Sequence, residues 1–177
     1  MRRTPLIFAV LLAGTAHAQF ANRSFGAGLS FVKFTGVDAA AGVEYAVPLT
    51  LEGSVYIENR FELYAQVPFM VVEVAVGADR PGQGRGEVFG TGGHLGARYL
   101  LLQESVRPYV GLELAAMAFF TKPDPKVFWG PGASAGVDWF ILDTVSIGAR
   151  GFFDLFIELN FPVRPTVGGG LNFAAYF

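Results

Sequence analysis

The chain has 177 residues, of which 52% are hydrophobic and only 16% are charged, whereas about 25% charged residues is usual in soluble domains. A net charge of −2 does not supply the basic surface of nucleic-acid-binding proteins. The lack of cysteine excludes disulfides, thiolate nucleophiles and cysteine-ligated zinc. This composition is typical of a membrane protein with a single domain.

The first segment has the features of an export signal. Residues 1–3 form a short positive start, residues 5–13 are apolar, and residues 16–18 (Ala-His-Ala) supply the small residues that precede a cleavage site. The alternative is a transmembrane helix, but the strongly apolar part is shorter than the about 20 residues that such a helix needs. We expect residues 1–18 to be a cleaved signal peptide and residues 19–177 to form the mature domain.

After the signal, no segment is long enough to be a transmembrane helix. The longest stretch without Asp, Glu, Lys, Arg or His covers residues 165–177, which is 13 residues. A hydrophobic exported chain without helical spans can live in lipid as a closed β-barrel, because every backbone polar group in lipid must be paired internally.

The hydrophobic pattern of the mature domain repeats every two residues. Between residues 145 and 157, apolar positions alternate with a face that carries both charges, Arg150 and Asp154. This period indicates β-strands rather than helices. Turn signals divide the domain, in chain order, into eight predicted strands: 24–35, 39–57, 61–77, 88–102, 106–120, 128–141, 144–158 and 163–177.

Short turns alternate with mostly longer connections between these strands. The longer ones include residues 78–87 and 121–127. This alternation predicts an all-β fold, an eight-stranded antiparallel up-and-down transmembrane β-barrel with short periplasmic turns and longer external loops. The second strand is the least regular, because Pro48 interrupts a strand ladder unless it lies at a bulge or near an end.

The period alone fits two barrels, one with its apolar face in lipid and one with its apolar face inside. The polar face of the strands is rich in glycine and serine, and the chain has only three lysines, whereas a soluble exterior is rich in Lys and Glu. Small residues instead suit a narrow interior, so we predict lipid outside. The alternative is a secreted, soluble, lipocalin-like barrel that binds an apolar ligand. We expect Phe119 and Phe128 near the loop ends, and Tyr109 near the turn ends, to belong to interfacial aromatic girdles.

The polar face also carries charges that would point into the lumen. Charges inside a narrow barrel must pair or reach water, because an unpaired buried charge is costly. We therefore expect a salt-bridge network that fills the lumen, and the alternative is a narrow, weakly cation-selective pore lined by the excess of acids. The predicted network consists of Glu44, Glu52, Glu62, His94, Arg98, Arg107, Glu113, Asp138, Arg150 and Asp154.

The strand pattern, the short alternate turns and the terminal Phe177 resemble the small outer-membrane barrels of the OmpA/OmpX-like β-barrel domain family, and residues 95–99 (LGARY) and 107–111 (RPYVG) are similar to strands of that family. The resemblance implies a monomeric integral outer-membrane protein of a Gram-negative bacterium, in contact with outer-membrane lipids, with a structural or surface-interaction role. Phe173 and Phe177 are similar to the C-terminal signal that the barrel assembly machinery recognises, although Ala175 stands where a bulkier residue is usual.

The sequence indicates no enzyme. His94 is the only histidine of the mature domain, and a hydrolase needs a nucleophile beside such a base. The outer-membrane lipid A deacylases have Ser two residues after their His, and Gly96 stands there in this chain. We predict no catalytic residues, no cofactor and no metal site. Any surface ligand is expected to bind residues 78–87, with help from residues 121–127.

Overall fold

The computed structural model describes residues 22–35, 43–58, 60–75, 85–121, 125–157 and 163–177. The strands are β1 (Arg23–Phe34), β2 (Tyr45–Ala46), β3 (Leu49–Glu58), β4 (Phe61–Ala75), β5 (Arg85–Leu100), β6 (Val106–Phe119), β7 (Lys126–Leu142), β8 (Val145–Phe156) and β9 (Arg164–Tyr176). Within these ranges, no helix is long and apolar enough to cross a membrane.

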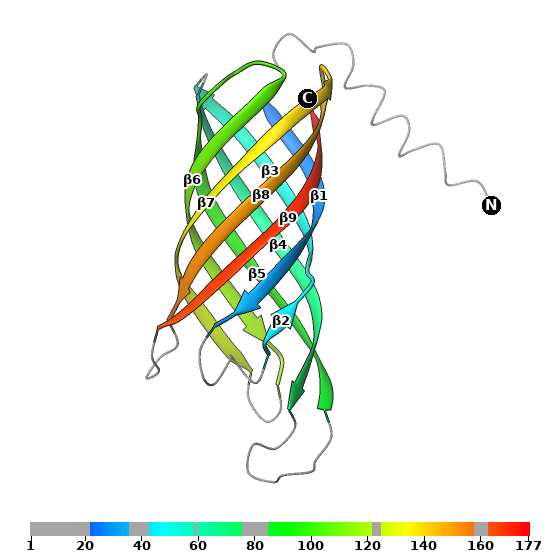
Figure 1. Cartoon of the computed structure of the whole chain (residues 1–177), viewed down its shortest axis with the longest axis vertical. Helices are drawn as coiled ribbons and strands as arrows, with labels where there is room; N and C mark the ends of the chain where they lie inside the picture. The colour runs from blue at the N-terminus through cyan, green and yellow to red at the C-terminus, as the bar shows by residue number, and fades with distance from the viewer. Residues whose placement is uncertain (1–21, 36–42, 59, 76–84, 122–124, 158–162) are drawn as a thin grey trace, which may run out of the picture.

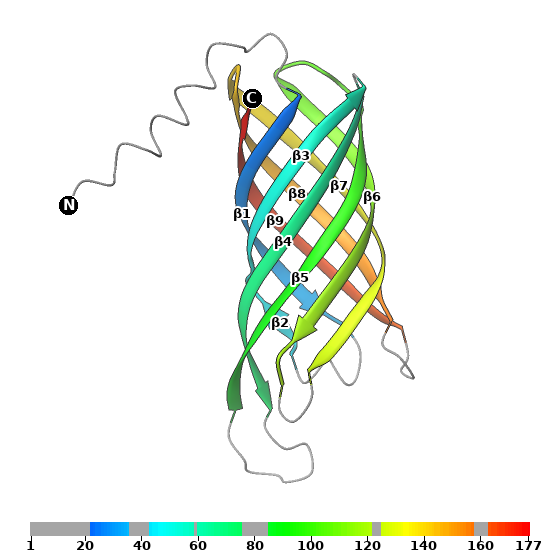
Figure 2. The same ribbon diagram turned by 180° about the vertical axis from the view of Figure 1, so that it is seen from behind.

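The strands form one closed antiparallel barrel whose strands are strongly tilted (Figure 1). Closure comes from β1 and β9, which pair from Ser24 opposite Tyr176 to Phe34 opposite Thr166. The backbones of Arg23 and Phe177 exchange hydrogen bonds of 3.2 and 2.9 Å at the end of this seam. The first and last strands therefore begin and finish at the same end of the barrel, as Figure 2 shows from behind.

β2 and β3 are two parts of one barrel strand, so the barrel has the predicted eight strands. Both parts pair with β1 in the same register, with Ala46 opposite Val32 and Leu49 opposite Leu29. Between them, Pro48 lacks a backbone N–H, but its carbonyl accepts a hydrogen bond of 3.1 Å from the N–H of Ser30. Pro48 thus interrupts the ladder without shifting the register.

The predicted strand order and alternation are confirmed, and most strand ends agree within a few residues. Several predictions fall outside the described residues. These are the signal peptide (residues 1–18), the beginning of the second predicted strand (residues 39–42), and most of the two long loops (residues 76–84 and 122–124).

The outer face of the barrel is apolar. Leu112, Leu95 and Leu171, in the middle of three different strands, are 73%, 66% and 66% exposed. Polar and charged side chains that alternate with them, such as Glu113, point inward and are buried. Such a belt suits hydrocarbon rather than water, and the reversed, lipocalin-like arrangement is wrong for this chain.

Glycines on the inner face make room for large rings from the neighbouring strand. Gly96 lies opposite Tyr64, and a Cβ at Gly96 would come within 2.6 Å of the Tyr64 ring. Gly136 lies opposite Tyr109 in the same way. At these two positions the small residues of the inner face leave no open space, because aromatic side chains fill the space above them.

Candidate functional site

The middle of the lumen holds a network of buried charges around Arg98 on β5. The Arg98 guanidinium makes two hydrogen bonds to the Glu52 carboxylate, of 2.6 and 2.9 Å, and lies 3.7 Å from Glu62. It also lies between two aromatic rings, 4.0 Å from the centre of Tyr64 and 4.8 Å from that of Tyr109. Bidentate pairing and ring stacking are what a buried guanidinium needs to replace its lost hydration.

A second arginine, Arg150 on β8, extends this network across the lumen. Its guanidinium donates hydrogen bonds to the side chains of Gln66 and Glu113, and lies 3.3 Å from the Tyr64 hydroxyl. The Gln66 amide in turn donates to Glu52, the partner of Arg98. Gln66 therefore joins the two arginine clusters into one hydrogen-bonded layer, which fixes the side chains that cross the lumen.

Three other predicted network residues, Arg107, Asp138 and Glu44, lie toward the two ends of the barrel. At the turn end, Arg107 stacks 4.0 Å from the centre of the Phe140 ring and lies 3.5 Å from the Tyr56 hydroxyl. Asp138, opposite Arg107 in the ladder, is buried. Glu44 lies elsewhere, because it is exposed at the loop end, just before β2.

The loop end of the lumen is apolar, which corrects the expectation of a polar filling throughout. Phe119 and Phe128, expected in the outer girdle, are 0% and 2% exposed and pack inside the barrel. The Phe119 ring contacts those of Phe34 and Phe128 edge-on, at 5.8 and 6.2 Å. Tyr109, also expected outside, points inward as well. Alternation places Phe119 on the same face as Glu113, and this signal in the sequence could have found it.

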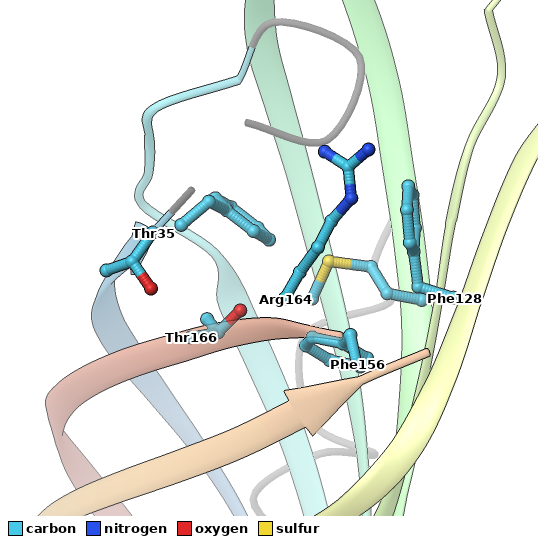
Figure 3. A pocket seen from close by; sticks show the side chains of 7 residues that line it. Thr35, Phe128, Phe156, Arg164 and Thr166 are labelled. Carbon is cyan, nitrogen blue, oxygen red and sulfur yellow. The ribbon is translucent and has the colours of Figure 1, made fainter. Parts of the chain in front are cut away.

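Figure 3 shows part of this apolar end, where Phe128, Phe156 and Arg164 surround a narrow recess. The recess is too narrow to admit a water molecule. We call the apolar cluster at this end the apolar plug. It is made of Val32, Phe34, Val43, Ala46, Met70, Val72, Ala115, Met117, Phe119, Phe128 and Phe156.

Two small cavities lie deeper in the lumen, and the side chains of Gln66 and Arg150 line both of them. One has a volume of about 30 Å³ and is also lined by Glu52 and Tyr109. The other has a volume of about 20 Å³ and is also lined by His94. Each holds only a few water molecules. The hydrogen-bonded pair of Gln66 and Arg150 therefore lies between the two cavities, and the apolar plug lies at the loop end of the lumen.

Next to the second cavity, three ionisable side chains from three strands meet. These are His94 on β5, Glu113 on β6 and Asp154 on β8, and one ligand atom from each lies within 4.8 Å of the others. All three are buried. The sequence prediction named each as a network member but did not bring them together. Their separation along the chain hides a cluster that only the strand register creates.

The predicted C-terminal signal lies on the lipid-facing surface. Phe173 and Phe177 are 50% and 54% exposed, at the end of β9 and just after it. Both are therefore accessible from outside the barrel wall rather than from the lumen.

No protein-family model and no curated protein matches the sequence. Solved structures do match. The outer membrane protein OprG from Pseudomonas aeruginosa is 14% identical, with a TM-score of 0.63, over 89% of this chain and 96% of that chain. Neisserial surface protein A (NspA) is 15% identical, with a TM-score of 0.63, over 88% and 97%. Ail, the attachment invasion locus protein of Yersinia pestis, is 13% identical, with a TM-score of 0.54, over 89% and 99%.

At these identities the shared property is the fold. The structure of this chain explains physically why it lies in a membrane. In the closed barrel the strands pair their backbone polar groups with one another, and the apolar outer belt suits contact with lipid. The chain is an integral outer-membrane β-barrel of the small eight-stranded class.

Proposed function

We propose that this barrel has a structural and surface-interaction role, with a lumen closed to ions and solutes. The observation that carries the proposal is the pair of barriers inside the barrel. Gln66 and Arg150 cross the lumen in the middle, and the apolar plug fills its loop end. An eight-stranded barrel has an interior just wide enough for side chains, so we expect no continuous aqueous path beside these groups in the described part of the barrel.

Planar-bilayer recording tests the closed lumen. We expect the purified, refolded protein to produce no conductance steps above the protein-free baseline, because an ion would have to cross the apolar plug without water. The folded state is checked by the change of electrophoretic mobility on boiling. Reproducible steps from the folded protein would contradict the proposal and favour the alternative, a narrow pore whose acidic lumen selects weakly for cations.

The surface role depends on the end of the barrel that carries the long loops. The hairpin of β4 and β5 extends beyond the other strands at this end (Figure 1), and its ladder continues to Ala75 opposite Arg85. Residues 76–84 connect its two strands, so the predicted loop 78–87 overlaps the first three residues of β5. We propose that this hairpin is the first part of the protein that a surface partner meets.

Deletion of residues 80–86 tests the surface role. We expect Gram-negative cells that express this variant to adhere less to cultured epithelial cells than cells with the full chain, while the mobility shift on boiling stays the same. The deletion also removes the first two residues of β5, Arg85 and Gly86, at the outer end of the hairpin. The barrel should still fold, because surface loops tolerate changes in length. Unchanged adherence at equal surface amounts would count against a role for this hairpin.

We also propose that the protein is not a hydrolase. His94 is 7% exposed and lies inside the lumen, behind the barrel wall. Its ionisable neighbours in the described part of the chain include the Glu113 and Asp154 carboxylates, and His94 Nδ1 lies 3.8 Å from Glu113 Oε1. A lipid substrate would need a site that faces the membrane, and catalysis by His94 would need a nucleophile within hydrogen-bond reach.

A further inference from the structure

The cluster of His94, Glu113 and Asp154 contains buried polar atoms that have no hydrogen-bond partner in the described part of the chain. Asp154 is 1% exposed, and neither of its carboxylate oxygens has a hydrogen-bond partner in the described part of the chain. The same holds for His94 Nδ1 and Glu113 Oε1. Buried carboxylates without partners are costly, and they are usually paired or bound to a metal.

The surrounding residues hold Glu113 with one oxygen facing the cluster. Arg150 and the Tyr64 hydroxyl both donate hydrogen bonds to Glu113 Oε2. This leaves Oε1 on the side of His94, whose Nδ1 lies 3.8 Å away. Outer-shell hydrogen bonds of this kind orient ligand carboxylates in metal sites.

The strand register lets the two carboxylates approach each other. Gly132 on β7 lies opposite both Glu113 and Asp154. A Cβ at Gly132 would come within 3.0 Å of Glu113 Cγ and 3.1 Å of Asp154 Cγ. Because the intervening strand has no side chain at this level, carboxylates from two strands that are not neighbours share one space.

The charge of the lumen also favours a cation. The side chains buried in the described lumen include the carboxylates of Glu62, Glu113, Asp138 and Asp154, together with the guanidinium of Arg98. Glu52 is paired with Arg98, and Arg150 with Glu113. Asp154, like Asp138, has no ion pair within 4.0 Å in the described part of the chain, so the two arginines do not directly neutralise its charge.

We propose that His94, Glu113 and Asp154 bind one divalent transition-metal ion, of which Zn²⁺ is the representative. One imidazole and two carboxylates suit Zn²⁺ and similar ions better than Ca²⁺ or Mg²⁺, which prefer oxygen ligands alone. Ligand atoms on one zinc lie at most about 4 Å apart. The ligand atoms of the three residues lie within 4.8 Å of one another, so side-chain movements of about 1 Å would bring all three into contact with one ion. The adjoining 20 Å³ cavity, lined by His94 and Asp154, accommodates a water molecule as the fourth ligand.

The position of the site predicts when the ion enters. The apolar plug covers the loop side of the cluster, and the Gln66–Arg150 pair covers the turn side. We therefore expect the folded barrel to exchange this ion slowly and to load it while the strands close. The site does not depend on the surface role proposed above, and conductance recordings do not test it.

The experiment is refolding of the chain, without a polyhistidine tag, from urea into detergent with Zn²⁺ present, followed by gel filtration in metal-free buffer. We expect the folded wild-type protein to retain roughly one zinc per chain by atomic emission. Refolding with Co²⁺ should give visible absorption bands from bound cobalt. Asp154→Asn and His94→Gln should each retain less than about a tenth of this metal.

Glu62→Gln is the matched control, because Glu62 is a lumen carboxylate with 1% exposure that lies outside the cluster. It should retain as much zinc as the wild type. Folded wild-type protein without zinc would overturn the proposal and would mean that protons alone neutralise the cluster. Equal zinc in wild type and Asp154→Asn would also overturn it, since the ion would then lie elsewhere. If Asp154→Asn does not fold, His94→Gln and the wild-type measurement still decide.

Discussion

Replacement of Arg98 by methionine is expected to lower the free energy of unfolding of the barrel by about 3–5 kcal/mol. The change leaves the Glu52 and Glu62 carboxylates buried without their shared cation. It also removes the group that stacks between Tyr64 and Tyr109. Urea unfolding in lipid vesicles measures the effect through the fluorescence of the two tryptophans, Trp129 and Trp139, which are both exposed on the outer face.

Arg60→Met is the matched control for this change. Arg60 is exposed at a turn and its side chain donates a hydrogen bond of 3.2 Å to the Tyr99 hydroxyl, so the loss of this side chain should cost less than about 1 kcal/mol. The double variant Arg98→Met, Glu52→Leu should recover part of the loss, since an apolar pair replaces a broken ion pair. Equal stability of Arg98→Met and Arg60→Met would show that the buried network contributes nothing to folding.

Replacement of Leu112 by arginine is the second large effect, with an expected loss of about 2–4 kcal/mol. Leu112 lies in the middle of β6 and is 73% exposed on the outer face, so its replacement would place a guanidinium in the middle of the bilayer. The same unfolding measurement in vesicles gives the value.

Leu101→Arg is the comparison for this variant, because Leu101 is exposed in the turn that follows β5. Near the interface an arginine costs only about 0–1 kcal/mol, so Leu101→Arg should be close to the wild type. A barrel that tolerates both changes equally would not have its Leu112 face in hydrocarbon, and the direction of the faces would have to be reconsidered.

The overall architecture is readable from the sequence because it depends on local properties. The two-residue period marks strands and their faces, and the alternation of short turns with longer loops marks an up-and-down order. Closure follows, since an open sheet edge is not tolerated in lipid. Even the irregular second strand is marked by Pro48, and the structure shows that the register continues through it.

The interior was predicted less completely, for two different reasons. Phe119 and Phe128 were assigned to an outer girdle from their residue type, although their parity along the strand places them inside, where the structure has them. Residue type is a weaker guide than parity here, because the aromatic rings of this chain occur on both faces of the wall. The apolar plug could thus have been found from the sequence.

The cluster of His94, Glu113 and Asp154 is a feature that the sequence alone does not predict. The short turns near residues 103 and 143 fix the registers of β5 with β6 and of β7 with β8, and these could be counted from the chain. Glu113 faces Gly132 across the longer loop of residues 120–125, whose length does not fix a register. The sequence determined which side chains point into the barrel, because strand alternation is local. Which of these side chains meet is visible only in the folded barrel, because it depends on the stagger between strands joined by a long loop.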